Sequence, residues 1–157
     1  MAEDRPIPAR GVVAADAPDR PAADDRARLP YDARWLRREV IETEGGLRVL
    51  VDLPEARVLT EGEMLTLEDG RAVEILAAAE PLAEIRPRDA HHLARLAWHL
   101  GNRHLPTRIE PGRLLIRRDH VIEEMLALLG AEIAHVEGPF DPEGGAYGHG
   151  QTMGHAH

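Results

Sequence analysis

The stretch that decides the fold spans residues 82–136 and reads LAEIRPRDAHHLARLAWHLGNRHLPTRIEPGRLLIRRDHVIEEMLALLGAEIAHV. It opens with a short apolar strand, and Pro87 and Asp89 then predict the start of a helix. Apolar residues at spacings of 0, 3, 4 and 7 form one stripe along this helix: Leu93, Leu96, Ala97 and Leu100. Gly101-Asn102 is typical of a helix end, because both residue types tolerate a left-handed backbone.

Two strands, a second helix and a final strand are predicted next. The segments 106–110 and 113–117 flank a Pro-Gly turn and predict a hairpin. Asp119 is a good N-cap for a helix that Gly130 ends, and residues 131–136 form a last strand. The order β-α-β-β-α-β is the ferredoxin-like motif, which hosts many functions and indicates none by itself. A unit this small also favours oligomerisation.

The preceding region, residues 31–79, has an apolar period of two and predicts a small all-β domain. Apolar residues alternate with other residues after Gly45-Gly46, at Leu47, Val49, Val51 and Leu53. This strand is predicted to form a hairpin with the apolar stretch around Val40-Ile41. A second hairpin is predicted around Asp69-Gly70. No catalytic cluster is visible here, so we expect this domain to serve protein contacts. The fold class is therefore α+β.

Both ends of the chain differ from these two domains in composition. Residues 1–30 contain five prolines and eight alanines among Asp and Arg, and we expect a disordered extension. Only Gly11 to Ala14 offers a candidate edge strand. Residues 141–157 are rich in Gly and His, which predicts a flexible tail after a domain that spans residues 80–140.

Composition excludes several classes of function. The 157 residues carry a formal charge of −9, which argues against a nucleic-acid partner. The absence of cysteine excludes disulfides and thiolate chemistry, and the absence of lysine and serine excludes Schiff-base and serine-triad catalysis. No apolar run approaches the roughly 20 residues of a membrane span, and the N-terminus does not resemble a signal peptide. We therefore expect a cytoplasmic protein without a membrane partner.

Nine histidines are the distinctive feature of the chain. Neutral imidazole suits Zn, Cu and Ni, so His149, His155 and His157 predict a loose chelating tail. His104 lies in a tight connection after a helix end, where one chain offers no evident second ligand. A two-fold dimer would turn this single histidine into a pair at the axis.

The remaining histidines leave alternatives open. His91, His92 and His99 are expected to be half-exposed residues that flank the first helix, and His135 is expected to be structural. His120 is equally consistent with a further ligand and with a solvated side chain. Two other classes compete with a metal carrier: an interaction module without metal, and a metal-dependent hydrolase that uses Asp119 and His120.

Three ordered motifs carry a resemblance to a known family. They are Ala97-Trp98-His99-Leu100 with Gly101-Asn102-Arg103-His104-Leu105-Pro106, then residues 119–126, then Pro142 to Tyr147 before a histidine-bearing end. Together they resemble the UreE family, the urease accessory nickel metallochaperones. The resemblance covers roughly residues 31–157.

The resemblance implies a β domain for protein contacts and a ferredoxin-like domain for metal binding and dimerisation. It implies a homodimer in which His104 of each subunit shares one Ni(II), with Zn(II) or Cu(II) as possible substitutes in vitro. It also implies delivery of nickel to apo-urease in a complex with the accessory GTPase, without enzymatic activity. Two departures limit the metal count: Arg118-Asp119-His120 replaces a His-x-His pair of some relatives, and the tail has only three histidines.

Overall fold

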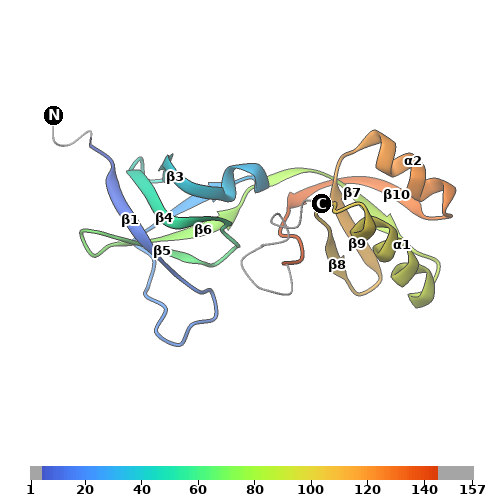
Figure 1. Cartoon of the computed structure of the whole chain (residues 1–157), viewed down its shortest axis with the longest axis horizontal. Helices are drawn as coiled ribbons and strands as arrows, with labels where there is room; N and C mark the ends of the chain where they lie inside the picture. Colours follow the sequence, from blue (N-terminus) through green and yellow to red (C-terminus); the bar gives the residue numbers. More distant parts are fainter. Residues whose placement is uncertain (1–4, 145–157) are drawn as a thin grey trace. The chain divides into compact units, whose positions relative to one another are not determined.

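The computed structural model describes residues 5–144, and the chain divides into two compact units, residues 1–78 and 79–157 (Figure 1). In its described residues, the first unit contains a six-stranded sheet and the short 3-10 helix η2. Its elements are β1 (Ile7–Val13), β2 (Asp25–Leu29), η2 (Tyr31–Arg34), β3 (Trp35–Glu42), β4 (Arg48–Val58), β5 (Met64–Leu67) and β6 (Ala72–Ala77). The strand order is β2-β6-β5-β1-β4-β3.

Both predicted hairpins of the first unit are confirmed. Strands β3 and β4 pair antiparallel with Ile41 opposite Val49, and β5 pairs antiparallel with β6. The turns contain Gly46 and Gly70 with φ of 87° and 94°, which a side chain would oppose. The alternating residues of β4 point into the core, where Val49 is fully buried. Period-two alternation thus predicted the buried face correctly.

The expectation that residues 1–30 are disordered was wrong for two segments. Strand β1 lies between β4 and β5, with Ile7 opposite Val49, so it is an interior strand and not an edge strand. Strand β2 pairs with β6, and Ala9 and Ala27 are fully buried. A single strand has no hydrogen-bond partner and no packing surface of its own. Strands distant in sequence supply the hydrogen bonds and the apolar surface that the segment lacks.

The second unit has the predicted β-α-β-β-α-β order. Its elements are β7 (Ala79–Arg86), α1 (Ala90–Asn102), β8 (Arg108–Glu110), β9 (Arg113–Arg117), α2 (His120–Leu128) and β10 (Glu132–Pro139). The sheet order is β10-β7-β9-β8 with every pair antiparallel. Apolar residues of both helices and one sheet face form a single core: Ala83, Ile85, Leu96, Leu100, Leu114, Ile116, Ile122 and Leu126.

The predicted helix starts are confirmed, and one helix end differs. The carboxylates of Asp89 and Asp119 accept hydrogen bonds from the backbone N–H of His92 and Ile122, at 2.7 and 3.0 Å. Helix α1, however, includes Gly101 and Asn102, and the left-handed residue that follows it is His104. Neither helix in the described part of the chain is long and apolar enough to cross a membrane.

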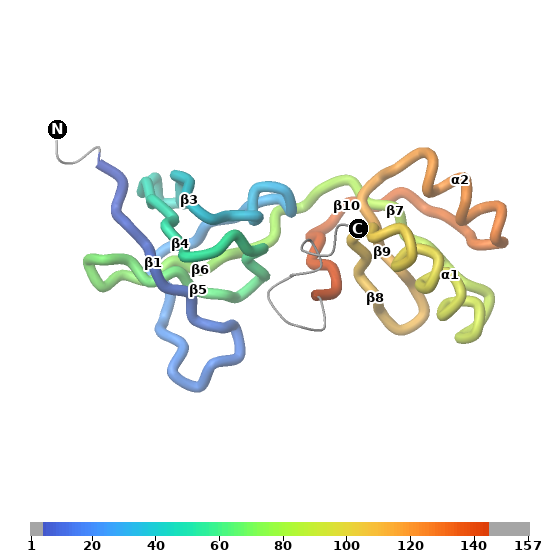
Figure 2. The backbone as a smooth tube through the Cα atoms, in the orientation of Figure 1, coloured from blue at the N-terminus to red at the C-terminus, as the bar shows by residue number. Residues whose placement is uncertain are grey.

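Figure 2 follows the backbone through β10 into the last described residues. After Pro139, Phe140 is fully buried, and the backbone N–H of Glu143 donates to the carbonyl of Thr107 at 2.8 Å. The segment that leaves β10 therefore lies beside the residues that lead into β8.

Candidate metal centre

His104 lies two residues beyond the C-terminus of α1, and the backbone around it forms a closed capping motif. The N–H of His104 donates to the carbonyl of Gly101 at 3.0 Å, and the N–H of Leu105 donates to the carbonyl of Leu100 at 3.2 Å. These two bonds define a Schellman motif, in which the residue after the cap adopts the left-handed conformation. His104 does so with φ of 57°, and among the described residues it alone has positive φ without being glycine.

Helix α2 ends in the same motif with a different residue. The N–H of Gly130 donates to the carbonyl of Ala127, and the N–H of Ala131 donates to the carbonyl of Leu126, at 3.0 and 3.1 Å. Gly130 has φ of 91°. Glycine is the usual residue in this conformation, whereas a side chain there costs roughly 1–2 kcal/mol. His104 therefore occupies a backbone position that its own side chain destabilises.

The surroundings of His104 favour a cation. Its side chain is exposed, and it follows the C-terminus of a 13-residue helix. The last carbonyls of a helix carry about −0.5 elementary charge, which stabilises positive charge within the last turn. An exposed imidazole at a helix C-terminus is therefore accessible to a metal ion and lies in a favourable field.

His120 is the first residue of α2, and 86% of its side chain is exposed. Its Nε2 lies 3.5 Å from the Glu124 carboxylate, one helical turn away. The other predicted ligands, His149, His155 and His157, lie outside the described residues. Within residues 5–144, no group of three or more His, Asp or Glu side chains is arranged to hold a metal ion. One described chain therefore brings His104 no complete ligand set.

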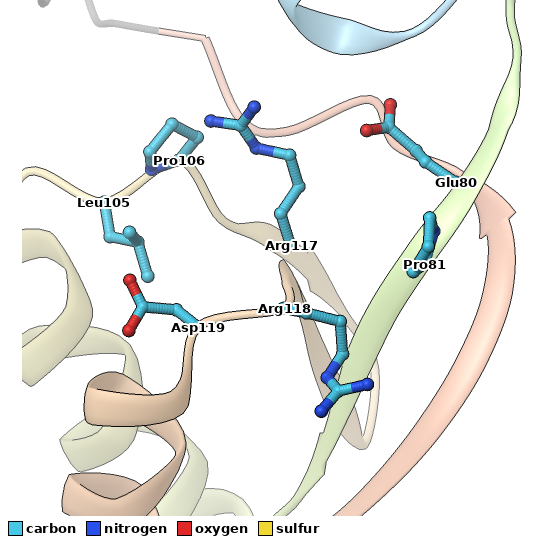
Figure 3. A pocket seen from close by; sticks show the side chains of 7 residues that line it. All are labelled: Glu80, Pro81, Leu105, Pro106, Arg117, Arg118 and Asp119. Carbon is cyan, nitrogen blue, oxygen red and sulfur yellow. The ribbon is translucent and has the colours of Figure 1, made fainter.

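A hollow of about 330 Å³ adjoins the His104 connection (Figure 3). Leu105 and Pro106 line it on one side, and Asp119 lines it beside the start of α2. The Leu105 side chain points toward Asp119 in Figure 3. The connection that carries His104 and the residue before His120 thus meet at one end of the second unit.

Asp119 itself is committed to the fold. Its carboxylate caps α2, and its N–H donates to Glu123 at 2.9 Å. Both interactions stabilise the helix start. A hydrolytic role for Asp119 would require it to give up this cap.

The interpretation of His92 as a half-exposed residue was wrong. Its side chain is buried, with Nδ1 accepting from the N–H of Arg88 at 2.9 Å and Nε2 placed 2.8 Å from the carbonyl of Leu129. Because Nδ1 accepts, Nε2 carries the proton and donates to Leu129, the C-cap of α2. His92 therefore ties the two helices together. His135 hydrogen-bonds Glu123 at 2.9 Å and is half-exposed.

The left-handed conformation of His104 was missed from the sequence, although a signal was present. Leu100 and Leu126 each end the buried stripe of their helix, and the left-handed residue follows four positions later in both cases. Apolar Leu105 directly after His104 is also typical of the motif, because it packs near Leu100.

Comparison with known proteins relates the whole chain to one family. Residues 10–78 match the family model for the N-terminal domain of UreE urease accessory protein, and residues 80–157 match the model for its C-terminal domain. The match of the first model begins inside the segment expected to be disordered. It includes part of β1 and all of β2.

Several relatives bear the name urease accessory protein UreE. The protein of Bradyrhizobium sp. (strain ORS 278) is 56% identical over 136 residues, which cover 87% of this chain and 63% of the relative. The protein of Ruegeria pomeroyi is 54% identical over 135 residues, which cover 86% of this chain and 89% of the relative. The protein of Chelativorans sp. (strain BNC1) is 50% identical over 141 residues, again with 89% of the relative covered. The chain thus spans less than two thirds of the Bradyrhizobium relative and nearly all of the other two. Both domains and their order match, and this chain belongs to the UreE family of urease accessory proteins.

Proposed function

We propose that this protein is a nickel metallochaperone, which binds Ni(II) and donates it to apo-urease during assembly of the urease metal centre. The observation that carries the proposal is His104 in a left-handed backbone position where α2 has Gly130. Strained residues of this kind cluster at functional sites. Membership of a family of urease accessory proteins supports the same conclusion.

The proposed site needs a second copy of the chain. His104 of each subunit supplies one imidazole to a Ni(II) ion on a two-fold axis, and His149, His155 and His157 supply further ligands. Exposed apolar residues on the helices support dimerisation through the second unit: Trp98 is 64%, Val121 66% and Leu128 89% exposed. Contiguous exposed apolar side chains mark interaction surfaces, and we assign these three to the dimer interface.

The first unit is proposed to contact the partner proteins, the urease apoprotein complex and the accessory GTPase. Strand β3 at the edge of its sheet exposes Trp35 and Val40, at 38% and 41%. Exposed apolar side chains on an edge strand suit docking to another protein. We place this activity in the cytoplasm, and we propose that the protein carries metal without catalysing a reaction.

Transfer of the cargo is proposed to occur by ligand exchange. Two imidazoles leave several positions of Ni(II) open to water, to tail histidines or to an incoming acceptor ligand. Imidazole binds metal only in its neutral form, so affinity should weaken in acid. Cu(II) should compete for the nitrogen ligands, as the Irving–Williams order predicts, and Zn(II) should bind as well.

The test is a calorimetric Ni(II) titration of the wild-type protein and of the His104→Ala and His104→Gly variants. Both substitutions should abolish the tightest site. The glycine variant guards against a folding artefact, because the same motif already accommodates Gly130. His91→Ala is the matched control, since His91 is an exposed histidine on α1, the helix that precedes His104. Retention of the tightest site in both His104 variants would refute the assignment.

Further measurements test the other proposed ligands and the alternative function without metal. Truncation after Tyr147 should lower the number of Ni(II) ions bound per dimer and leave the solution mass dimeric. His120→Ala decides whether His120 contributes a ligand. An interaction module without metal would show no tight divalent binding in the wild-type protein at neutral pH.

A further inference from the structure

Leu105, the residue after His104, is anchored through both of its backbone polar groups. Its N–H donates to the carbonyl of Leu100 at 3.2 Å, and its carbonyl accepts from the hydroxyl of Thr107 at 2.9 Å. Its side chain packs against the core that the two helices share with the sheet. The first hydrogen bond belongs to the helix end, whereas the second comes from the residue directly before β8. Leu105 therefore cannot turn without breaking one of these contacts.

Thr107 is itself held in place from its other side. Its carbonyl accepts from the N–H of Glu143 at 2.8 Å, and the next residue, Arg108, donates from Nη1 to the carbonyl of Asp141 at 2.9 Å. Arg108 is also the first residue of β8, which pairs antiparallel with β9. The hydroxyl that reaches Leu105 thus belongs to a residue that is fixed by the sheet and by the segment after β10.

Pro106 leaves the chain between His104 and Thr107 with little conformational freedom. Proline has no N–H to donate, its φ is fixed at about −65°, and the residue before it is restricted to extended conformations. The Thr107 hydroxyl supplies the hydrogen bond that the proline nitrogen cannot. His104 has φ of 57°, and a change to the ordinary negative φ would redirect the chain after it. The anchored Leu105 opposes this change.

We infer that Thr107 is a positioning residue, whose hydroxyl holds Leu105 and so keeps His104 in the left-handed conformation from which its imidazole is presented to the nickel ion. The inference rests on the proposed function and concerns only the site that two His104 side chains share. The end of α2 supports it. There Gly130 adopts the left-handed conformation without strain, and the position that corresponds to Thr107 is Ile133, whose side chain has no hydrogen-bonding group.

The effect of Thr107 on affinity is larger for a shared site than for a site within one chain. Apparent affinity falls in proportion to the fraction of a protein in its binding-competent conformation, and a shared site needs both copies to be competent. A substitution that leaves roughly half of the His104 connections in the native conformation therefore weakens Ni(II) binding about fourfold.

The experiment compares the full-length wild-type protein with Thr107→Val, Thr107→Ser and Ile116→Val. Valine keeps the β-branched shape of threonine without the hydroxyl, whereas serine keeps the hydroxyl. Ile116→Val is the matched control for lost stability, because Ile116 is fully buried in the same core and lies in β9. Ni(II) affinity is measured by competition with a chelator. Amide exchange at His104 and Leu105, whose N–H groups close the helix end, is measured without metal.

We expect Thr107→Val to speed amide exchange at His104 and Leu105 and to weaken Ni(II) binding about fourfold, while Thr107→Ser and Ile116→Val stay close to wild type. Unchanged exchange in Thr107→Val would overturn the inference, and so would faster exchange with unchanged affinity. An equal loss of affinity in Ile116→Val would also overturn it, because lost stability would then explain the effect. So would an equal loss in Thr107→Ser, because the hydroxyl would then not be the group that acts. Absence of tight Ni(II) binding in the wild-type protein would instead refute the proposed function, and with it this role for Thr107, whereas the exchange rates would still show whether the hydroxyl holds Leu105.

Discussion

The C-termini of the two helices use the same hydrogen bonds and differ in the residue at the left-handed position. After α1 this residue is His104, exposed, with φ of 57°; after α2 it is Gly130, with φ of 91°. Both ends are closed by a 6→1 bond to a fully buried leucine, Leu100 or Leu126. Both helices therefore end in the same Schellman motif, and glycine is the residue that the left-handed position of this motif favours.

Under the proposed function, the difference between the two ends separates stability from metal binding. At α2 the choice of residue follows the backbone, whereas at α1 the backbone accepts a residue that costs free energy. The strain at His104, roughly 1–2 kcal/mol, is tolerated because the buried leucine and the two hydrogen bonds hold the motif closed. A side chain on such a closed turn starts from a well-defined backbone position, which suits the role proposed for His104 as a ligand shared between two copies of the chain.

The largest effect on stability should come from the buried leucine at each helix end. Leu100→Ala and Leu126→Ala each remove a fully buried side chain from one core, and each should lower the free energy of unfolding by about 2–5 kcal/mol. Urea denaturation measures both. A cost below about 1 kcal/mol for either leucine would show that the two ends are not equivalent.

The next effect concerns Gly130. Gly130→Val places a β-branched side chain at positive φ, and the stability should fall by about 1–3 kcal/mol. Ni(II) affinity should remain at the wild-type value, because Gly130 follows α2 whereas His104 follows α1. A loss of nickel binding in a folded Gly130→Val protein would contradict the separation of stability from function.

A smaller effect of opposite sign is expected at His104. His104→Gly relieves the left-handed strain but adds freedom to the unfolded chain, for a net gain of about 0.5–1 kcal/mol. His104→Ala keeps a side chain at positive φ and should change stability little. The urea midpoints of the metal-free variants measure the difference. No gain for glycine over alanine would mean that His104 is not strained.

The smallest effect is a pH dependence of the free energy of unfolding. It arises from Glu84, which lies at neither helix end, so the comparison of the two ends is unaffected. Hydrogen bonds from Arg86 and then Arg113 hold the pKa of Glu84 below its ordinary value of 4.5. A lowered folded pKa contributes stability above pH 4.5 that is lost as the pH falls through the folded value. Glu84→Gln should make stability less sensitive to acid in this range, measured by thermal unfolding from pH 6 to pH 3. An unchanged acid profile would contradict this role of Glu84.

Some of these features follow from local sequence. The helix stripe from Leu93 to Leu100, the cap by Asp119 and the turns at Gly46 and Gly70 were predicted correctly, because each depends on residues within one or two turns. The metal site stays a prediction, in which His104 is shared across a dimer. His104, His120 and the tail histidines remain predicted ligands, since a shared site depends on contacts that one chain does not contain.

The sequence by itself determined the two-domain α+β class, the hairpins β3-β4 and β5-β6 and the order of the elements in the second unit, because periodicity and capping act over a few residues. Only the tertiary structure decided that Ile7 enters a sheet beside Val49, that His92 is buried between the helices, and that Arg108 holds Asp141. Each of these partners lies more than 30 residues away along the chain. Contacts at that separation are decided by how the sheets assemble, which local propensity does not encode.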